Sequence, residues 1–264
     1  MLNWISIPRL RAAASVALAF ATVLELGVVA TPSVHAQTYR EKLLYSFTGT
    51  TDGASPEASL VRDRAGNLYG TALLGGDPSC TQWQGNSCGV VFEVTKTGKE
   101  TVLYSFTGTP DGASPYAPVV RDAAGNLYGT TYAGGVSGGC GAVYEVTDTG
   151  NESVLFSFNG TDGCQPDSGL IRDKAGNLFG TTGDGGPSGY GTVFKLDTSG
   201  TETVLHFFSG LPDGESPIAG LARDTKGNLY GTTFNGGSGY GTVFKVDANG
   251  TETVLYSFTG GTDG

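Results

Sequence analysis

One line of sequence recurs four times along this chain, and this repetition limits the fold more than any other feature. The copies are VRDRAGNLYGTALLGG, VRDAAGNLYGTTYAGG, IRDKAGNLFGTTGDGG and ARDTKGNLYGTTFNGG. Their aspartates Asp63, Asp122, Asp173 and Asp224 follow one another at about 50 residues, a period typical of propeller blades. The first interval is longer because copy one carries an insertion from Asp77 to Cys88.

Each copy divides into four short strands, A to D, separated by turn residues. In copy four we expect strand A at 220–223, B at 229–233, C at 242–247 and D at 251–258. The A–B and C–D turns carry Asp, Asn and Gly, which close hairpins, and the turn aspartates are expected to cap them. Consecutive apolar residues in the strands predict sheets that are covered on both faces. The sequence therefore predicts an all-β, β-propeller-like array of four-stranded blades.

The repeat units cover residues 48–106, 107–158, 159–208 and 209–258, and residues 259–264 begin another unit. Before them, Lys42 to Phe47 matches strand D, so five D-type strands accompany four A–B–C sets. We expect a fragment of a larger ring, in which the extra N-terminal D-type strand closes the last blade. A glycine recurs within strand B, at Gly70, Gly129, Gly180 and Gly231, where a side chain is expected to collide with a neighbouring backbone.

Residues 1–36 have the features of a secretory signal peptide. Arg9 and Arg11 precede an apolar run, and Val34-His35-Ala36 fits a small-residue cleavage site before Gln37. An uncleaved N-terminal anchor is the alternative. We expect an exported protein that is secreted or attached to the cell surface. The periplasm and the outer surface are both possible locations. The mature chain is not expected to insert into a membrane.

The net charge of −10 excludes some partner classes. Nucleic acid and anionic lipid both require clustered Lys and Arg, so neither is an expected partner. The acidity is compatible with cation binding, or it only keeps an exported protein soluble.

The motif GNLYGTT-x-x-GG…GYGTVFKV, with LYSF-x-G-x-x-DG-x-SP joining the copies, closely resembles the GloVer tandem repeat of bacterial exported and surface proteins. The match extends over nearly all of residues 43–264. The resemblance implies export, a propeller-like array and a C-terminal sorting or anchoring segment, and it implies no catalytic residues. No such segment follows the repeats in this sequence, which agrees with the expectation of a fragment.

Four cysteines in an exported chain predict two disulfides, for which three pairings are possible. Cys80 and Cys88 flank the insertion in copy one, while Cys140 and Cys164 lie in loops that a propeller places on one face. We favour the pairs 80–88 and 140–164. A metal site is disfavoured because no Cys-x-x-Cys pair and no nearby histidine accompany these cysteines.

Two kinds of polar residue are candidate sites of chemistry. His206 occupies a strand D position held by Tyr or Phe in the other copies, so a packing role is expected rather than a catalytic one. The loop aspartates Asp52, Asp111, Asp162 and Asp213 recur in DG-x-S/Q-P. They could line calcium sites, although turn formation by Asp-Gly explains the spacing without a metal. No other cofactor is expected.

Aromatic residues in the B–C and D–A loops are the candidate ligand contacts. They are Trp83 in the insertion, Tyr190 and Tyr240, and exposed rings of this kind stack on sugars. The alternative is that each tyrosine packs on its own blade. We predict a non-catalytic exported scaffold that binds carbohydrate or protein through the face bearing these loops, named the loop face. A polysaccharide lyase or glycosidase and a spacer without ligand are the alternatives; Asp167, Asp184 and Glu215 depart from the repeat, but nothing in the sequence pairs them.

Overall fold

The computed structural model describes residues 40–80, 87–136 and 139–263. The chain divides into two compact units, Met1–Lys42 and Leu43–Gly264, and the second contains all the strands. The predicted signal peptide lies outside the described residues, as does Trp83. Within the described ranges, no helix is long and apolar enough to cross a membrane.

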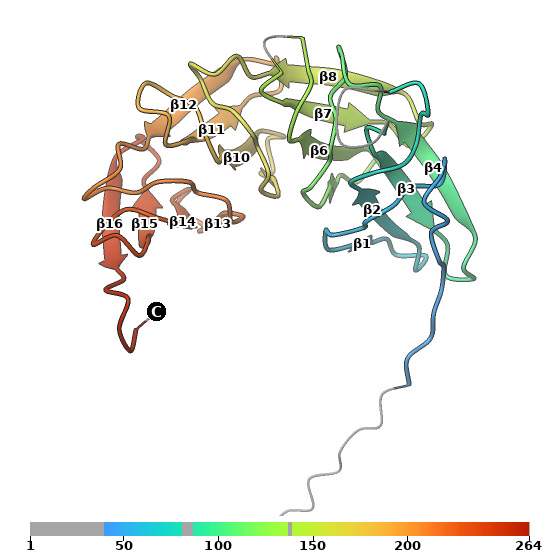
Figure 1. Ribbon diagram of the computed structural model, residues 1–264, viewed down its shortest axis with the longest axis horizontal. Helices are drawn as coiled ribbons and strands as arrows, with labels where there is room; N and C mark the ends of the chain where they lie inside the picture. The colour runs from blue at the N-terminus through green and yellow to red at the C-terminus, as the bar shows by residue number, and fades with distance from the viewer. Residues whose placement is uncertain (1–39, 81–86, 137–138, 264) are drawn as a thin grey trace, which may run out of the picture. The chain divides into compact units, whose positions relative to one another are not determined.

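The second unit contains four antiparallel sheets of four strands each, and in every sheet the strands lie in chain order (Figure 1). We name the sheets blades 1 to 4. Blades 1 and 2 consist of β1 (Val61–Arg62), β2 (Leu68–Ala72), β3 (Val90–Val94), β4 (Glu100–Ser105), β5 (Val120–Arg121), β6 (Leu127–Thr131), β7 (Ala142–Val146) and β8 (Glu152–Ser157). Blades 3 and 4 consist of β9 (Ile171–Arg172), β10 (Leu178–Thr182), β11 (Thr192–Leu196), β12 (Glu202–Phe207), β13 (Ala222–Arg223), β14 (Leu229–Thr233), β15 (Thr242–Val246) and β16 (Glu252–Ser257).

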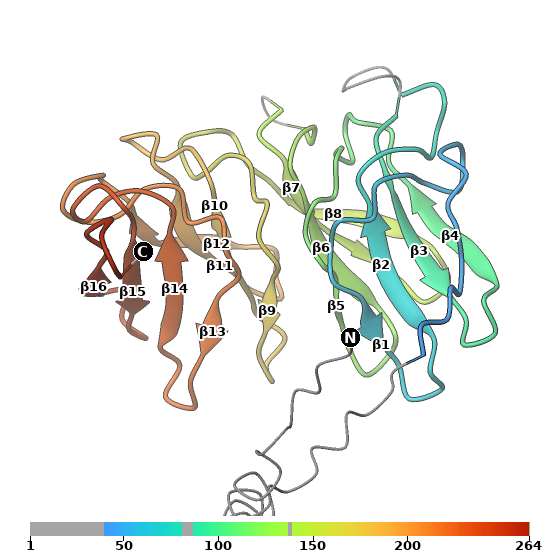
Figure 2. The same ribbon diagram turned by 60° about the horizontal axis from the view of Figure 1, so that its bottom comes forward.

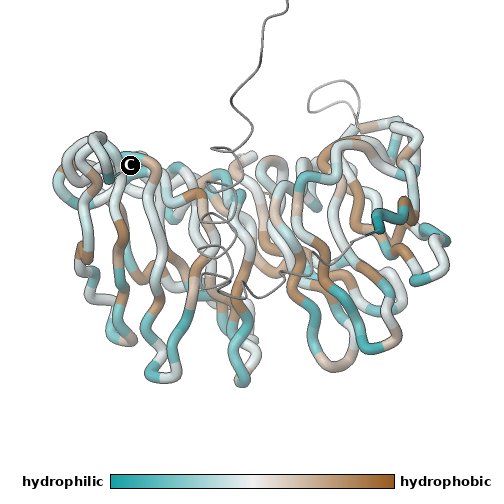
Figure 3. Tube along the Cα trace, turned by 90° about the horizontal axis from the view of Figure 1, so that it is seen from below, coloured by the Kyte–Doolittle hydropathy of each residue, from teal (hydrophilic) through white to brown (hydrophobic). Residues whose placement is uncertain are grey.

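The predicted all-β, propeller-like array of four-stranded blades is confirmed. In blade 4, strand B matches the prediction at both ends, strands C and D are shorter by one or two residues, and strand A keeps only its last two residues. Each sheet thus begins with a two-residue strand and ends with a six-residue strand. Figure 2 shows the strands of each blade side by side in chain order. Along these sheets, hydrophobic residues lie mainly in the strands and hydrophilic residues gather at the turns (Figure 3).

The prediction of a strand at residues 42–47 is wrong as far as hydrogen bonding is concerned. This segment pairs with no strand in the described part of the chain, because its expected partner would be a strand C of a preceding blade. Its side chains nevertheless pack as a strand D would: Leu44, Tyr45 and Phe47 cover the buried residues of blade 1.

The hairpin between strands A and B is closed by the recurring aspartate, as the sequence predicts. In blade 1, the Asp63 Oδ1 atom accepts hydrogen bonds from the backbone N–H groups of Gly66 at 2.7 Å and Asn67 at 2.8 Å. Gly66 has a φ of +95°, which favours glycine. The same carboxylate therefore satisfies two turn donors, and Asp122 does so with the same partners in blade 2.

Consecutive blades contact each other through recurring aromatic residues, and we call each such contact a seam. The phenylalanine after strand D packs edge-on against the aromatic residue of the next strand C. Ring centroids are 5.0 Å apart for Phe106–Tyr144 and 5.1 Å apart for both Phe158–Phe194 and Phe208–Phe244. Each of these clusters contains buried residues from two consecutive blades. The hydrophobic core is thus distributed over the seams.

In blades 2 to 4 the arginine of strand A adds a cation–π contact to its seam. The guanidinium lies over a strand B ring of the preceding blade, at 5.1 to 5.3 Å from the ring centroid: Arg121 over Tyr69, Arg172 over Tyr128 and Arg223 over Phe179. Arg172 and Arg223 also lie 4.0 and 3.9 Å from the preceding turn aspartates. The recurring residues of the motif therefore bind one blade to the next.

The recurring glycine in strand B is required by a side chain, which corrects the expectation of a backbone collision. A Cβ atom on Gly180 would lie 2.8 Å from the Phe194 ring of the same blade. On Gly70 it would lie 2.9 Å from the Phe92 ring. The glycine leaves room for the aromatic ring that fills the seam.

Candidate binding site on the loop face

One part of the loop face has the same backbone conformation in every blade. Each D–A loop forms one antiparallel bridge with the residue two positions after strand B: Ala54 with Leu74, Ala113 with Ala133, Cys164 with Asp184, and Glu215 with Asn235. The next residue has a positive φ, between 54° and 59°, at Ser55, Ser114, Gln165 and Ser216. Because this backbone recurs, side chains can differ between blades without any change of scaffold.

Two stations of the loop face change residue from blade to blade. The first lies two residues after the positive φ and holds Glu57, Tyr116, Asp167 and Ile218. The second follows strand B and holds Leu73, Tyr132, Gly183 and Phe234. Residues that recur maintain the seams, whereas a binding site needs side chains that belong to one or two blades. Loops on a rigid scaffold are where such residues concentrate.

Tyr116 and Tyr132 of blade 2 form an aromatic pair at these stations. Their ring centroids are 5.5 Å apart at an interplanar angle of 62°. Tyr132 donates its backbone N–H to the Ser114 carbonyl at 3.0 Å, which fixes it beside the D–A loop. Tyr116 is 38% exposed and Tyr132 is half-buried. Tyr116 therefore presents aromatic surface to solvent while Tyr132 supports its ring.

Asp167 and Asp184 of blade 3 interact with each other at the same seam. The backbone of Asp184 is held by two hydrogen bonds with Cys164, 2.7 and 3.0 Å long. Burial, together with the negative charge of Asp184, raises the pKa of Asp167 to about 6. The Oδ1 atom of Asp167 is buried and has no hydrogen-bond partner. Asp167 therefore takes up a proton far more readily than an exposed aspartate does.

The tyrosines and the aspartates form one electrostatic group. Burial raises the pKa of Tyr132, and the charges of Asp184 and Asp167 raise it further, followed by an interaction with Tyr116. We call these four residues the Tyr–Asp cluster. It combines an exposed ring with a carboxylate that accepts hydrogen bonds and a carboxyl group that also donates when protonated. Hydroxyl-rich ligands with an apolar ring face need these three kinds of contact.

Two of the three aromatic residues predicted to bind ligand, Tyr190 and Tyr240, lie outside the Tyr–Asp cluster. Tyr190 is half-buried against the cluster of the seam between blades 3 and 4, where its ring approaches Gly210. Tyr240 holds the same station in blade 4 and is 58% exposed. Trp83 belongs to the insertion and lies outside the described residues. Ligand binding by these three residues stays a prediction.

The loop aspartates predicted as calcium ligands are engaged with donors of their own loops. Asp52 accepts hydrogen bonds from the Tyr45 hydroxyl at 2.7 Å and the Thr48 N–H at 2.8 Å. Asp111, which is 4% exposed, accepts corresponding bonds from Tyr104 and Thr107, and Asp162 accepts bonds from Asn159. These contacts stabilise the loop without a metal, and calcium binding stays a prediction.

Asp213 is the loop aspartate with the most unusual surroundings. His206 Nε2 lies 3.2 Å from its Oδ2 atom, and one ligand atom each of His206, Asp213 and Glu252 lie within 4.8 Å of one another. His206 also packs edge-on against Phe208, with ring centroids 4.8 Å apart. The histidine therefore has the packing role expected from the sequence and a hydrogen-bond partner that the sequence did not indicate.

A glutamate at the start of each strand D faces a loop aspartate of the preceding seam. Burial raises the pKa of Glu152 to about 7, and the charge of Asp111 contributes. Burial, with a contribution from the charge of Asp162, likewise raises the pKa of Glu202 to about 7. One carboxylate oxygen of each glutamate is buried without a hydrogen-bond partner. At these two seams the folded protein therefore holds a glutamate whose pKa is raised by burial.

Both favoured disulfides are present, Cys80–Cys88 and Cys140–Cys164. The first closes the base of the insertion in blade 1, where both cysteines are buried. The second joins the B–C loop of blade 2 to the D–A loop of blade 3. Because Cys164 forms the bridge with Asp184, this disulfide also anchors the Tyr–Asp cluster.

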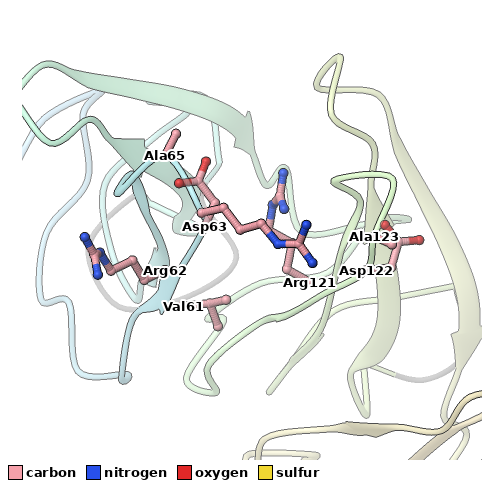
Figure 4. A pocket seen from close by; sticks show the side chains of 8 residues that line it. Val61, Arg62, Asp63, Ala65, Arg121, Asp122 and Ala123 are labelled. Atoms are coloured by element: carbon pink, nitrogen blue, oxygen red, sulfur yellow. The ribbon is translucent and has the colours of Figure 1, made fainter.

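A separate pocket of about 580 Å³ lies at the A–B turns of blades 1 and 2 (Figure 4). It is lined by Val61, Arg62, Asp63, Arg64, Ala65, Arg121, Asp122 and Ala123. Most of its polar residues recur in the motif: the two aspartates cap turns, and Arg121 lies over Tyr69. The pocket is therefore part of the recurring scaffold.

Sequence reasoning singled out Asp167 and Asp184 as departures from the repeat but did not pair them, and it missed Tyr116 and Tyr132. An alignment of the four copies contains the signal, because all four residues occupy the variable stations or the position next to one. What the alignment lacks is the bridge that brings residues 164 and 184 together.

Comparison with known proteins decides the family. The model of the Gloeobacter/Verrucomicrobia repeat matches residues 79–264. This chain belongs to that repeat family. The resemblance to the GloVer repeat is thereby confirmed, and the Tyr–Asp cluster lies within the matched region of this Gloeobacter/Verrucomicrobia repeat protein. No curated protein matches its sequence.

Solved structures similar to this family member match it at low sequence identity. One is described as a candidate gluconolactonase, with 15% identity, 75% of this chain and 62% of that one covered, and a TM-score of 0.44. Another is the extracellular domain of a protein assigned as a one-component system of B. thetaiotaomicron, with 12% identity, 79% and 23% covered, and a TM-score of 0.51. A gluconolactonase of Xanthomonas campestris has 14% identity, 80% and 79% covered, and a TM-score of 0.41. The chain spans less than two thirds of the first two.

Proposed function

We propose that this protein is an exported repeat scaffold that binds carbohydrate at the Tyr–Asp cluster of its loop face. The observation that carries the proposal is the convergence of four copy-specific residues, Tyr116, Tyr132, Asp167 and Asp184, on one seam of an otherwise recurring framework. The two disulfides support export, because such bonds persist in oxidising compartments.

The chemistry of the cluster favours a neutral or amino sugar over an acidic ligand. The Tyr116 ring offers an apolar face on which a pyranose C–H face stacks. Asp184 and Asp167 provide oxygens for hydroxyl groups, and charge-assisted hydrogen bonds are the stronger kind. The chain is acidic overall, with a net charge of −10, so an anionic polysaccharide would be repelled.

A glycan array followed by calorimetric titration of the best ligand tests the proposal. Replacing Tyr116 with alanine is expected to weaken binding about tenfold or more, since loss of about 1.4 kcal/mol of stacking corresponds to a factor of ten. Tyr240→Ala serves as the matched control, because Tyr240 is also an exposed tyrosine but belongs to blade 4. Binding that weakens in Tyr240→Ala and not in Tyr116→Ala would contradict the proposal and would place the ligand at the aromatic residues predicted from the sequence, among them Tyr240.

The aspartate pair also favours a second function, acid–base catalysis on the bound glycan. A carboxyl group with a pKa of about 6 beside an ionised carboxylate is the arrangement in which one group donates a proton and the other accepts one. The two functions are separated by incubating the protein with the glycan identified on the array. Cleavage that is lost in Asp167→Asn identifies an enzyme, whereas unchanged glycan identifies a binding protein.

A further inference from the structure

The seam between blades 3 and 4 brings a histidine and two carboxylates together. His206 lies in β12, Asp213 in the D–A loop that follows it, and Glu252 at the start of β16. One ligand atom of each residue lies within 4.8 Å of those of the other two, and among the residues that the structure describes this is the one such group of three. Both blades of this seam belong to the chain, and all three residues come from them and from the loop that joins them.

Two of these three residues recur at every seam, whereas the histidine does not. In each blade the glutamate of strand D interacts electrostatically with a loop aspartate, in the pairs Glu100–Asp52, Glu152–Asp111, Glu202–Asp162 and Glu252–Asp213. The third residue differs. Tyr45 and Tyr104 donate their hydroxyl groups to their aspartates at 2.7 and 2.6 Å, and Phe156 has no polar atom to offer. His206 is therefore the copy-specific residue that adds a nitrogen ligand to a recurring pair of carboxylates.

The distance between His206 and Asp213 is that of two ligands sharing one metal ion. His206 Nε2 lies 3.2 Å from the Oδ2 atom of Asp213 and 3.3 Å from its Oδ1 atom. Two ligand atoms that each bind a zinc ion at about 2.0–2.2 Å lie about 3.0–3.5 Å apart. The His206 ring packs edge-on against Phe208, with ring centroids 4.8 Å apart, which holds the imidazole in place. A neutral His206 can therefore exchange its contact with Asp213 for a metal bond with little movement.

The carboxylate of Asp213 is oriented by Ser209. The backbone N–H and the hydroxyl group of Ser209 both donate to the Oδ2 atom, at 2.9 and 3.1 Å. Hydrogen bonds of this kind fix the orientation of a metal-binding carboxylate. With Oδ2 held by Ser209, the Oδ1 atom that faces His206 is the one placed to share a metal ion with it.

Glu252 completes the group from blade 4. Its Oε1 atom is buried and has no hydrogen-bond partner within the described ranges, and a buried polar atom without a partner is costly. Burial raises the pKa of Glu252, and the negative charge of Asp213 raises it further, so the two carboxylates repel each other. A cation between them would relieve this repulsion and give the glutamate a partner.

The chemistry of the ligands indicates the class of ion. Imidazole binds zinc and other divalent transition metals, whereas calcium prefers sites made of oxygen atoms alone. The side chains of His206 and Asp213 are 18% and 14% exposed, so an ion can enter from solvent and a water molecule can complete its coordination. Three protein ligands with one open position are typical of zinc sites that retain a water molecule.

We propose that the seam between blades 3 and 4 binds one Zn²⁺ ion through His206 Nε2 and one carboxylate oxygen each of Asp213 and Glu252. The ion joins β12, the D–A loop and β16, so its binding links blade 3 to blade 4. The site is separate from the Tyr–Asp cluster, which lies at the seam between blades 2 and 3, and it is independent of carbohydrate binding.

Calorimetric titration of the tag-free, metal-stripped full chain with Zn²⁺ tests the proposal. One ion per chain is expected to bind. His206→Tyr introduces the residue that blades 1 and 4 have at this station, where the tyrosine hydroxyl donates to the loop aspartate, so the variant is expected to fold. Its affinity for Zn²⁺ is expected to fall by more than about 100-fold. Ser209→Ala, which removes one hydrogen bond that orients Asp213, is expected to weaken binding about tenfold.

A matched pair of glutamate variants separates this site from the other seams. Glu252→Gln is expected to weaken Zn²⁺ binding about tenfold or more. Glu202→Gln is the control, because Glu202 holds the same station in blade 3 but faces an aspartate whose neighbour is Phe156, and it is expected to bind as the wild type does.

Nitrogen NMR of the chain labelled at histidine provides a second readout that reports on the ligand itself. The chain has one other histidine, His35, so the His206 signals are assigned by their loss in His206→Tyr. Addition of Zn²⁺ is expected to shift the Nε2 signal of His206 and to leave that of His35 unchanged. A wild type that binds no Zn²⁺ at millimolar concentration, or a stoichiometric site that persists in His206→Tyr, would overturn the proposal. So would equal losses in Glu252→Gln and Glu202→Gln, or a site that prefers Ca²⁺ and is unaffected by His206→Tyr.

Discussion

Replacing Phe158 with alanine is expected to lower the free energy of unfolding by about 3–5 kcal/mol, the usual effect of removing a buried aromatic ring. Phe158 has no exposed surface and packs on Phe194 across the seam between blades 2 and 3. The cavity would open where two blades meet, so both blades lose contacts. Chemical denaturation monitored by tyrosine fluorescence and circular dichroism measures the change.

Phe258→Ala is the matched control, because the two phenylalanines hold the same station in different blades. Phe258 is half-buried, and its ring contact is with Tyr256 of its own blade, at 5.1 Å between centroids. Its removal from the monomer is expected to lower the free energy of unfolding by about 1 kcal/mol. Equal losses in the two variants would contradict the assignment of the core to the seams.

The stability of the protein is expected to fall as the pH rises from about 4.5 to about 7. The folded-state pKa values of Glu152 and Glu202 are about 7, above their ordinary value of 4.5, so the folded protein retains protons that the unfolded chain has released. Their contribution to stability is complete below pH 4.5 and is lost through this window. After allowance for solvent screening at half-exposed sites, each residue contributes about 1 kcal/mol.

Aspartates whose pKa is lowered in the folded protein have the opposite effect on the pH dependence of stability. Their contribution is lost at acidic pH, which limits the stability of the protein there. Hydrogen bonds from Thr48 and Tyr45 hold the pKa of Asp52 below its usual value against the opposing effect of burial, so its contribution is lost as the pH falls below 3.8. Maximal stability is therefore expected between about pH 3.8 and pH 4.5. Thermal unfolding of Glu152→Gln/Glu202→Gln should show a smaller decline from pH 5 to pH 8 than the wild type, because Asp167 and Glu252 still lose protons there, whereas Glu57→Gln, an exposed control, declines as the wild type does. A wild-type melting temperature that rises over this range would contradict the assignment.

Much of the fold could be predicted from the sequence because glycine and Asx residues mark the hairpins. Strand B of blade 4 was located at both ends, since Asn228 precedes it and a glycine-rich loop follows it. Strand A was predicted too long, because hydrophobicity continues into residues that form no ladder. The segment at 42–47 was predicted as a strand because its sequence is that of strand D. A strand, however, requires a partner, which local sequence does not reveal.

The site was harder to predict than the fold, because its residues are far apart in the sequence. Tyr132 and Asp184 come together only through the bridge between Cys164 and Asp184 and the seam between blades 2 and 3. Tyr190 illustrates the converse: an aromatic residue in a glycine-rich loop suggested an exposed ring, yet it packs against the seam between blades 3 and 4. Loop composition alone did not distinguish a seam residue from a ligand residue.

The most direct test of the Tyr–Asp cluster is the titration of the Asp167 carboxyl group, followed by carbon NMR of labelled aspartate in the wild type and in Asp184→Asn. The structure predicts a pKa of about 6 for Asp167 in the wild type. It predicts a lower pKa in the variant, because the neighbouring negative charge is gone while burial remains. An Asp167 that titrates near 3.8 in the wild type, or is unaffected by Asp184→Asn, would contradict the convergence of copy-specific residues on this seam.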